Sequence, residues 1–367
     1  MSEVVPFEIQ TEIIRKLPIK SLIQFRSVSK PWKALIDSSK FIADHSVRHN
    51  QPNHLLVRYA VKSGPKFISV VDNDDDSFPQ MKSSITAPES LNLLSNVLVL
   101  GSSHGIVCFC GSHRDQDNTR RRMVVLWNPS IRKSVRIDIP NLDNRIMVVG
   151  FGVCPNTSDI KLVKITEGST CEVEVYSVNS GVWRSIPMDK PCKPLMFTWY
   201  QTSINGVIYW HAFEYIQMHD GSGNIIRSFN LTSEESEDIL LPDCLLSTFG
   251  NFYVSKLLDS LVVIKGYREA GKSFCDVWML SHGVSESFTK LFNIVAPYGS
   301  SDSSVLAFRK NGEVIMEIDS AELQVFEPCS KNFRDLRIFG NDFVNSVDVC
   351  SYTETLLLLN QSDLVLH

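Results

Sequence analysis

The sequence predicts a small all-α domain of three helices in residues 1–45, followed by an all-β propeller in residues 46–367. Two observations lead to this fold class. Apolar residues recur at helical spacing in the first 41 residues, and a unit of about 50 residues repeats through most of the remainder. The repeat favours six blades, with strands from the N-terminal side of the propeller docked in the last blade to close the ring.

Two prolines bound the first predicted helix. Pro6 suits a helix start, where its missing N–H is no loss, and Pro18 ends the helix because proline cannot continue the hydrogen-bond ladder. Between them, four aliphatic residues fall along one side of a helix: Ile9, Ile13, Ile14 and Leu17. The pattern predicts one amphipathic helix.

Two further helical segments follow. A short second turn carries three apolar residues: Leu22, Ile23 and Phe25. Ser29 can cap a third helix with Pro31 in its first turn. The apolar residues of that helix are spaced by three and four positions: Trp32, Leu35 and Ile36. About forty residues bury little core on their own, so this many large apolar groups indicate a surface for a partner.

The repeat in the remainder has a recognisable unit. An aromatic residue in a predicted strand is followed by a turn and a second strand, which ends near a proline or another apolar residue. The five aromatic residues are Trp127, Tyr176, Phe229, Trp278 and Phe326. Successive members are 49, 53, 49 and 48 residues apart. A period near 50 residues with about four strands is the size of one propeller blade.

Continuous apolar runs alternate with these units and predict strands buried on both faces. There are six runs, at residues 105–109, 160–165, 206–210, 261–264, 314–318 and 356–359. Since there are only five aromatic units, the last blade lacks outer strands at the C-terminal end. Two early strands, at residues 54–59 and 66–71, complete it and remove the exposed edges of an open ring. Residues 41–53 are predicted to be a linker.

Composition narrows the class of protein. Hydrophobic residues make up 43% of the chain and charged residues 21%, as in ordinary soluble globular proteins. Residues 1–50 hold eight Lys/Arg against five Asp/Glu, whereas the remainder holds 28 against 36. The acidic balance of the large domain argues against nucleic acid as its main ligand. No apolar run approaches the roughly 18 residues of a membrane span, and a signal peptide is not recognisable, so no membrane partner is expected.

The nine cysteines are scattered and include no Cys-x-x-Cys pair, which argues against a structural zinc site. Cys108 and Cys110 alternate with apolar residues in a predicted core strand, so neither is expected to act as a nucleophile. The pattern indicates reduced, buried thiols of an intracellular protein in the cytoplasm or the nucleus.

Catalytic motifs are absent from the sequence. No zinc-protease motif, nucleophile elbow or phosphate-binding loop occurs. The run Asp72–Asp76 lacks the alternating ligands and terminal glutamate of a calcium loop, and predicts a solvated turn. Arg120–Arg122 predicts a charged hairpin tip, with an anion-binding or nuclear-import patch as the alternative. We therefore expect no catalytic residue, no metal and no cofactor.

The helical segment carries a specific set of residues in a specific order: Val5-Pro6, Ile13-Ile14, Leu17-Pro18, Leu22, Val28-Ser29-Lys30, Trp32, Ile36-Asp37-Ser38 and Phe41. This set resembles the F-box, the adaptor-binding module of cullin-type (SCF) ubiquitin ligases. Val5 is a departure, because the family more often has leucine there, and it costs some packing. A plain helical core accounts for Ile9, Phe25 and Leu35, but not for two aliphatic–proline pairs flanking the first helix.

The resemblance to the F-box implies a binding surface for a Skp-type adaptor. Carried over residue by residue, the implied contacts are Val5, Pro6, Ile13, Ile14, Leu17, Pro18, Leu22, Val28 and Trp32. Through that adaptor the chain would reach a cullin scaffold.

The remainder is similar to the F-box-associated domain of plant F-box proteins, a relative of kelch propellers. The likeness rests on Leu100–Cys108, Leu126–Lys133, Gly150–Gly152 and Asn205–Trp210, while the Gly-Gly doublets of kelch blades are missing. It implies a non-catalytic substrate receptor of an SCF ubiquitin ligase, whose propeller holds an unidentified target protein. Such a receptor acts by proximity, raising the local concentration of target lysines near a ubiquitin thioester.

Two other classes stay open at this point. One is a propeller enzyme, of a glycan-processing or copper-oxidase type, which needs carboxylates or metal ligands at one mouth of the ring. The other is a non-ligase scaffold or glycan-binding module tethered through the F-box. The target-binding residues are unknown, and the candidate loops are those around Lys190–Thr198, Tyr215–Asn224, Tyr267–Lys272 and Ala296–Ser303.

Overall fold

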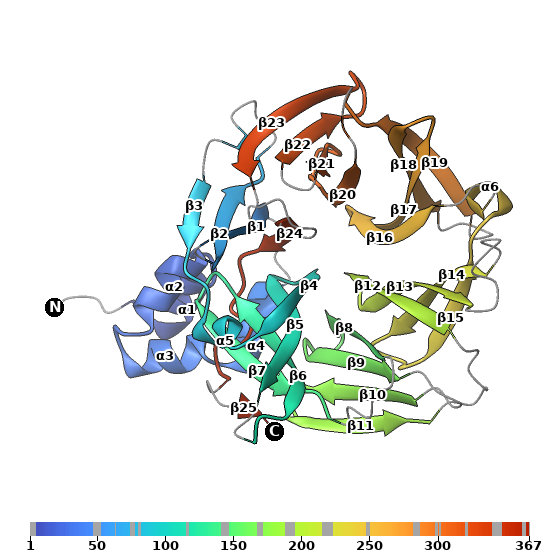
Figure 1. Ribbon diagram of the computed structural model, residues 1–367. Coiled ribbons are helices and arrows are strands. Elements are labelled where there is room, and N and C mark those ends of the chain that lie inside the picture. The colour runs from blue at the N-terminus through green and yellow to red at the C-terminus, as the bar shows by residue number, and fades with distance from the viewer. Residues whose placement is uncertain are drawn as a thin grey trace.

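The computed structural model consists of a helical domain beside a ring of strands (Figure 1). It describes residues 5–46, 53–62, 64–73, 78–79, 82–114, 117–140, 147–166, 172–187, 195–214, 223–246, 250–281, 287–297, 300, 302–319, 322–339, 347–361 and 365–366. The helical domain contains α1 (Phe7–Arg15), α2 (Ile19–Phe25), α3 (Lys30–Ile36) and α4 (Ser39–Ser46). Two short helices, α5 (Glu89–Asn92) and α6 (Asp243–Leu246), lie in connections of the ring.

Local sequence signals define the first three helices. Pro6 precedes α1, and Pro18 both ends the first helical segment and precedes α2 in extended conformation. Ser29 caps α3, because its Oγ accepts a hydrogen bond from the Trp32 N–H at 3.3 Å. These starts agree with the sequence prediction.

An ion pair joins the end of α2 to the end of α3. Arg26 donates two hydrogen bonds to the carboxylate of Asp37, at 2.5 and 3.0 Å. Burial by itself would raise the pKa of Asp37, but the bonds from Arg26 and Lys33 hold that pKa below its ordinary value. The pair links the C-terminal ends of the two helices.

The helical domain has a fourth helix that the sequence prediction assigned to a linker. Residues 39–46 form α4, in which Phe41 and Ile42 are buried. His45, which falls in the predicted linker, is buried as well, and its Nε2 lies 3.3 Å from the carbonyl oxygen of Leu17. The linker prediction was wrong here because short apolar pairs within polar sequence gave too weak a periodicity.

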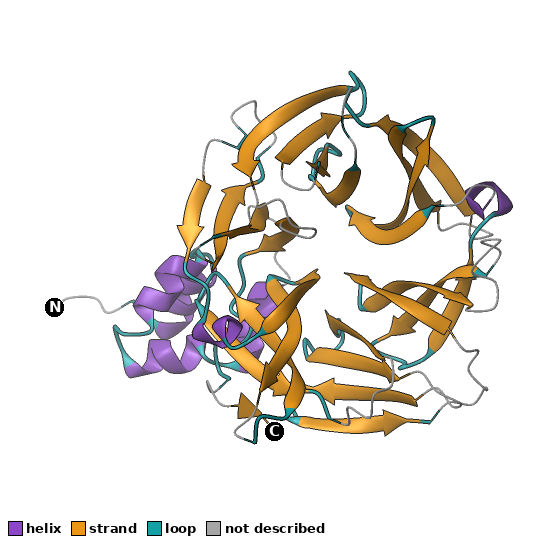
Figure 2. Ribbon diagram, in the orientation of Figure 1, coloured by secondary structure: helices purple, strands orange, loops and turns teal. Residues whose placement is uncertain are grey.

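The ring is built from six sheets, or blades, each with four antiparallel strands, and blade 1 has a fifth strand that pairs in parallel (Figure 2). From inside to outside, blade 1 is β4 (Ser95–Ser103), β5 (Ile106–Arg114), β6 (Arg120–Asn128) and β7 (Lys133–Asp138), with β25 (Val365–Leu366) added outside. Blade 2 is β8 (Met147–Val153), β9 (Ile160–Thr166), β10 (Glu172–Ser177) and β11 (Val182–Ile186). Blade 3 is β12 (Leu195–Ile204), β13 (Val207–Glu214), β14 (Asn224–Asn230) and β15 (Ser236–Leu240).

The remaining blades follow the same plan. Blade 4 is β16 (Asn251–Leu257), β17 (Ser260–Glu269), β18 (Lys272–Ser281) and β19 (Ser287–Val295). Blade 5 is β20 (Ser303–Phe308), β21 (Val314–Ile318), β22 (Glu322–Glu327) and β23 (Asn332–Phe339). Blade 6 combines both ends of the propeller: β24 (Val347–Thr353), β1 (Asn53–Val61), β2 (Gly64–Val71) and β3 (Lys82–Ile85). In blade 6, β24 pairs antiparallel with β1 from Asn53↔Thr353 to Tyr59↔Val347.

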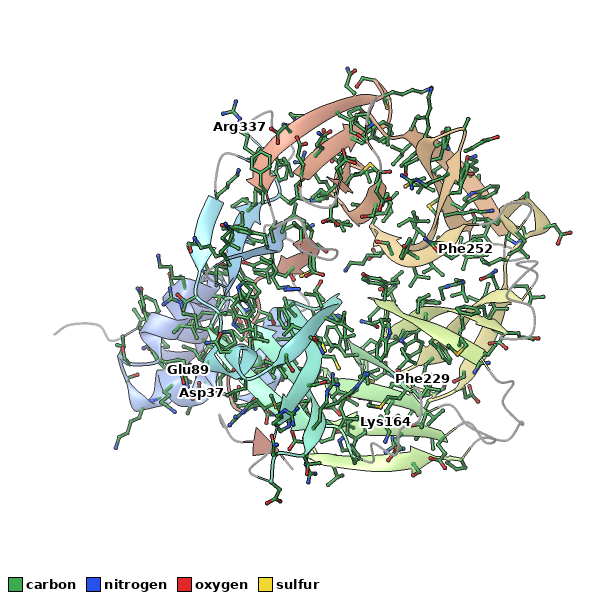
Figure 3. The ribbon with its side chains drawn as sticks, viewed as in Figure 1. Asp37, Glu89, Lys164, Phe229, Phe252 and Arg337 are labelled. Carbon is green, nitrogen blue, oxygen red and sulfur yellow. The ribbon has the colours of Figure 1, made fainter. Side chains whose placement is uncertain are left out.

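The predicted repeat coincides with the blades. All five aromatic markers of the repeat lie in the third strand of their blade: Trp127, Tyr176, Phe229, Trp278 and Phe326. Four of them are buried, with Trp278 only partly so, and side chains from neighbouring blades fill the space between sheets (Figure 3). The six-blade count is confirmed.

Five of the six predicted core runs lie in second strands, and the sixth does not. Residues 356–359 form a turn, not a strand, although all four leucines are buried. The second strand of blade 6 is β1, whose residues Leu55, Leu56 and Val57 supply the expected apolar run. The prediction for residues 356–359 was wrong because a short apolar run reports burial and not backbone conformation.

All innermost strands run in the same direction through the ring. A Cβ on Gly105, just after β4, would lie 2.2 Å from the Thr353 carbonyl oxygen at the end of β24. Likewise, a Cβ on Gly206, just after β12, would lie 2.4 Å from Cδ of Pro155, just after β8. The ends of neighbouring innermost strands therefore meet at one face of the ring. We call this the end face, and the opposite face the start face.

Gly150 of β8 has no room for a side chain. A Cβ there would lie 2.2 Å from Cζ2 of Trp210 and 2.9 Å from Cγ2 of Ile208. Gly150→Ala is therefore expected to lower the free energy of unfolding by about 1–3 kcal/mol through overpacking, as measured by urea denaturation. The matched control is Gly266→Ala, because the nearest atom to a Cβ there is 4.0 Å away. An equal loss in both variants would contradict this explanation.

Candidate interaction surfaces

Exposed apolar side chains gather in the helical domain. Among the described residues, twelve large hydrophobic side chains are exposed, and five of them fall within residues 5–28. These five, which we call the apolar patch, are Val5, Phe7, Ile9, Ile13 and Val28. Ile9 and Ile13 are 52% and 54% exposed and lie one helical turn apart, so their side chains are neighbours on α1. Such a concentration is typical of a protein-binding surface.

Two polar side chains connect the parts of the apolar patch. Trp32 Nε1 on α3 donates a hydrogen bond to Gln10 Oε1 on α1 at 2.8 Å. Gln10 Nε2 in turn donates to the carbonyl oxygen of Val5 at 2.7 Å. These bonds join the start of α1 to the start of α3. Val28, the fifth residue of the apolar patch, lies just before α3. The exposed residues at the two helix starts are therefore presented together.

The structure separates the nine predicted adaptor contacts into surface and core. Five are exposed: Val5, Pro6, Ile13, Pro18 and Val28. Leu17 and Trp32 are partly buried and pack against the core of the helical domain.

Two of the predicted contacts are inaccessible. Ile14 and Leu22 are only 2% and 0% exposed. Their sides of α1 and α2 face the interior of the helical domain, so a direct contact of either residue with an adaptor stays a prediction. Conversely, Phe7 and Ile9 are exposed, although neither was among the predicted adaptor contacts and Ile9 was compatible with a plain helical core.

One continuous core joins the helical domain to the ring. Buried helix residues and blade residues pack around the C-terminal turn formed by residues 356–359; the helix residues are Ile14, Ile19, Leu22, Ile36, Phe41 and Ile42. The turn is held by Asn128, whose Nδ2 donates to the carbonyl oxygens of Thr355 at 2.9 Å and Leu357 at 2.8 Å. Since this turn continues from the end of β24, the helical domain lies toward the end face.

The four candidate target-binding loops all connect strands at the start face. They leave β11, β13, β17 and β19, each of which ends at that face because the innermost strand of its blade ends at the other. Residues 188–194, 215–222, 298–299 and 301 of these loops, including Tyr298, lie outside the described residues. The segment Tyr267–Lys272 is mostly strand, with a two-residue turn at Ala270 and Gly271 and an exposed Arg268. The loop prediction there was therefore too long.

Arg120–Arg122, predicted as a hairpin tip, begins strand β6 instead. The described residues Asp117–Thr119 belong to the connection between β5 and β6. Arg122 lies over the ring of Trp199 in blade 3, with Cζ 4.5 Å from the ring centroid. This contact joins two blades.

The ring encloses a cavity of about 200 Å³ on its axis. Residues from five innermost strands, β4, β12, β16, β20 and β24, line it. Its polar lining includes Tyr200, Tyr253, Lys256, Glu317 and Asp348. Tyr200 and Tyr253 meet edge to face with ring centroids 5.7 Å apart.

Two buried thiols and one buried histidine have pKa values shifted by burial toward their neutral forms. Burial raises the pKa of Cys110 and Cys275 to about 11, which keeps both thiols protonated and poorly nucleophilic. Burial also lowers the pKa of His211 to about 4, so this imidazole is neutral and bonds to Asn224 Oδ1 at 2.7 Å. Within the described ranges, no three His, Cys, Asp or Glu side chains are grouped as metal ligands. None of the helices described is long and apolar enough to span a membrane.

The fold and the apolar patch define an F-box protein that carries a β-propeller. Residues 5–44 match the family model of the F-box domain, and residues 67–358 match that of the F-box associated beta propeller domain. The second match covers most of the chain, which therefore belongs to the F-box-associated propeller family.

Curated relatives agree with this assignment. The F-box protein CPR1 of Arabidopsis thaliana is 26% identical over 91% of this chain and 84% of its own length. A putative F-box/kelch-repeat protein of the same plant is 23% identical over 97% of this chain and 99% of its own length. Among solved structures, a putative 6-phosphogluconolactonase from Bacteroides uniformis aligns with 82% of this chain and all of its own, at 6% identity and a TM-score of 0.42.

Proposed function

We infer that this chain is a substrate-recognition subunit of an SCF-type ubiquitin ligase. The observation that carries the inference is the apolar patch, because it lies in the segment that matches the F-box and exposes large aliphatic side chains at two helix starts. Burying Ile9 and Ile13 against a Skp-type adaptor would contribute about 1.5–3 kcal/mol for each side chain. A cullin scaffold would then be reached through the adaptor.

The propeller would hold the target protein at its start face. That face lies opposite the F-box side of the ring, and it carries the connections between blades. The shared core around residues 356–359 supports a fixed orientation between the adaptor-binding surface and the target. Catalysis then rests on proximity, because the target lysines are held near a ubiquitin thioester on another subunit, and this chain contributes no catalytic residue.

We place the complex in the cytoplasm or the nucleus. The supporting observation is that the seven described cysteines are all free, as expected in a reducing compartment. Imaging of a tagged full-length chain in plant cells tests this placement, and accumulation in a secretory compartment would oppose it.

Reconstitution tests the proposed function directly. The full-length chain is mixed with a Skp-type adaptor and analysed by size-exclusion chromatography, then supplied with cullin, RING subunit and a charged ubiquitin-conjugating enzyme. We expect a one-to-one complex with the adaptor and cullin-dependent ubiquitin transfer to lysines of the chain itself. Adaptor binding without any transfer would favour a non-ligase scaffold, and failure to bind the adaptor would refute the proposal.

A further inference from the structure

Lys256 in the ring cavity differs from two mostly buried lysines of strand β9. Lys161 pairs with Glu234, its Nζ 2.8 Å from the carboxylate, and Lys164 pairs with Glu174. Lys256, near the end of β16, makes no hydrogen bond or ion pair with any residue in the described part of the chain. Its side chain is only half-buried because it faces the cavity. Its ammonium therefore has donors directed at the cavity and not at protein.

An isolated ammonium inside a ring is energetically costly. Burial lowers the pKa of Lys256, and the nearby Asp259 and Cys350 offset this shift only in part. The pKa of His104 is lowered mainly by burial and further by the positive charge of the nearby Lys256. An unpaired cation that is partly removed from water lowers stability unless a ligand supplies the missing charge.

The rest of the lining complements a small molecule with one polar end. Ser255 and Ser351 lie near Lys256, toward the end face, and add short hydroxyl groups, whereas the Ser102 hydroxyl donates to the carbonyl oxygen of Ser351. Partly buried aliphatic side chains, including Val305 and Leu306, line the cavity beside them. One end of the cavity is therefore lined by the Lys256 ammonium and serine hydroxyl groups, and aliphatic side chains line the surface beside them.

The acidic groups lie nearer the start face. Asp348, the second residue of β24, is paired with Arg58, whose Nε is 2.7 Å from its carboxylate. Glu317 of β21 lies opposite Ser304 in the strand register, and Ser304 is near the start of β20. Because these two carboxylates share the cavity, the site is close to neutral overall and would repel a multiply charged anion.

We propose that the cavity on the ring axis is a binding site for a small monocarboxylate with a short apolar body, whose carboxylate is held by Lys256. A single unpaired ammonium matches a single negative charge, whereas inorganic phosphate carries more than one negative charge at neutral pH and would place the excess charge in a site that is close to neutral overall. A cavity of about 200 Å³ restricts the ligand to roughly ten non-hydrogen atoms.

Thermal unfolding of the purified full-length chain tests this site with defined probes. The probes are propionate, butyrate and benzoate at millimolar concentrations, each compared with its neutral amide and with sodium chloride at equal ionic strength. We expect the carboxylates to raise the melting temperature in a saturable manner, while the amides and chloride do not. Inorganic phosphate is expected to have no effect beyond that of chloride.

Lys256→Met separates binding from folding. This variant keeps the length of the side chain and removes the charge, so its ligand-free melting temperature is expected to equal or exceed that of the wild type. Its affinity for the carboxylates, measured by isothermal titration calorimetry, is expected to fall about ten- to a hundredfold. Lys272→Met, an exposed position in the same blade, is the matched control and should bind as the wild type does.

Several outcomes would overturn the proposal. Equal shifts from carboxylates and amides, no shift from any carboxylate, or unchanged binding by Lys256→Met would each show that the cavity holds only solvent or binds without the ammonium. If Lys256→Met fails to fold, Lys256→Gln serves as the milder neutral variant, and its binding decides the question. None of these readouts depends on the adaptor, so the result is independent of the proposed ligase function.

Discussion

The double variant Ile9→Asp/Ile13→Lys is expected to lose at least about a hundredfold in affinity for a Skp-type adaptor. Each isoleucine is more than half exposed on α1, so the variant removes contact area without disturbing the core of the helical domain. Burying either new charge against an apolar partner adds a desolvation penalty of several kcal/mol. The affinity is measured by isothermal titration calorimetry with the purified adaptor.

The two substitutions are chosen so that the helix itself remains stable. An aspartate at position 9 lies in the first turn of α1 and a lysine at position 13 near its last turn, and both charges suit the helix dipole. They are also four residues apart, so they can pair along the helix. Far-UV circular dichroism and the melting temperature should therefore match the wild type.

Leu240→Asp is the matched control for that experiment. Leu240 is 76% exposed, on the outer strand β15 of blade 3, and lies far from the F-box in the sequence. We expect this variant to bind the adaptor as tightly as the wild type. If Leu240→Asp binds poorly, or if Ile9→Asp/Ile13→Lys binds normally while folded, the apolar patch is not the adaptor-binding surface.

The double variant Leu356→Ala/Leu359→Ala is expected to destabilise the helical domain much more than the ring. Both leucines are buried in the core shared by the two parts, at 0% and 6% exposure. Their truncation should cost about 2–5 kcal/mol for each leucine through lost burial and cavity formation. Most of this loss should destabilise the helices, because the helical domain by itself has too few residues to form an independent core.

Hydrogen exchange detected by mass spectrometry measures the separation. In the variant, peptides from α1 to α4 should lose protection, whereas those from β13 and β17 should keep it. Leu240→Ala is the control for leucine truncation and should change neither region, since its side chain is exposed. Uniform loss of protection across the ring would mean that the turn stabilises the propeller and not its junction with the helices.

Sequence reasoning captured the features that depend on periodicity. The aromatic residues of the third strands recur because each blade needs the same bulky side chain at the same layer between sheets, and this constraint survives in spacing alone. The helix starts at Pro6, Pro18 and Ser29 were likewise local signals, because capping and proline geometry need no tertiary information.

Features that depend on which surface is covered were not predictable in this way. Ile9 and Ile14 are both aliphatic residues on a short helix, and the periodicity does not tell which of them faces the C-terminal turn. The four leucines at 356–359 indicated burial, but a strand and a packed turn both bury such a run, so the backbone conformation could not be predicted. Lys256 gave no sequence signal at all, since its isolation arises only when five innermost strands meet around the axis.

The most direct test of the account is a hydrogen-exchange footprint of the full-length chain with and without a Skp-type adaptor. Adaptor binding is expected to protect peptides covering residues 5–15 and 28–32, while the described strand ends at the start face, including the turn at Ala270 and Gly271, exchange unchanged. Protection at the start face with none in the helical domain would contradict this expectation, because the adaptor would then occupy the surface assigned to the target.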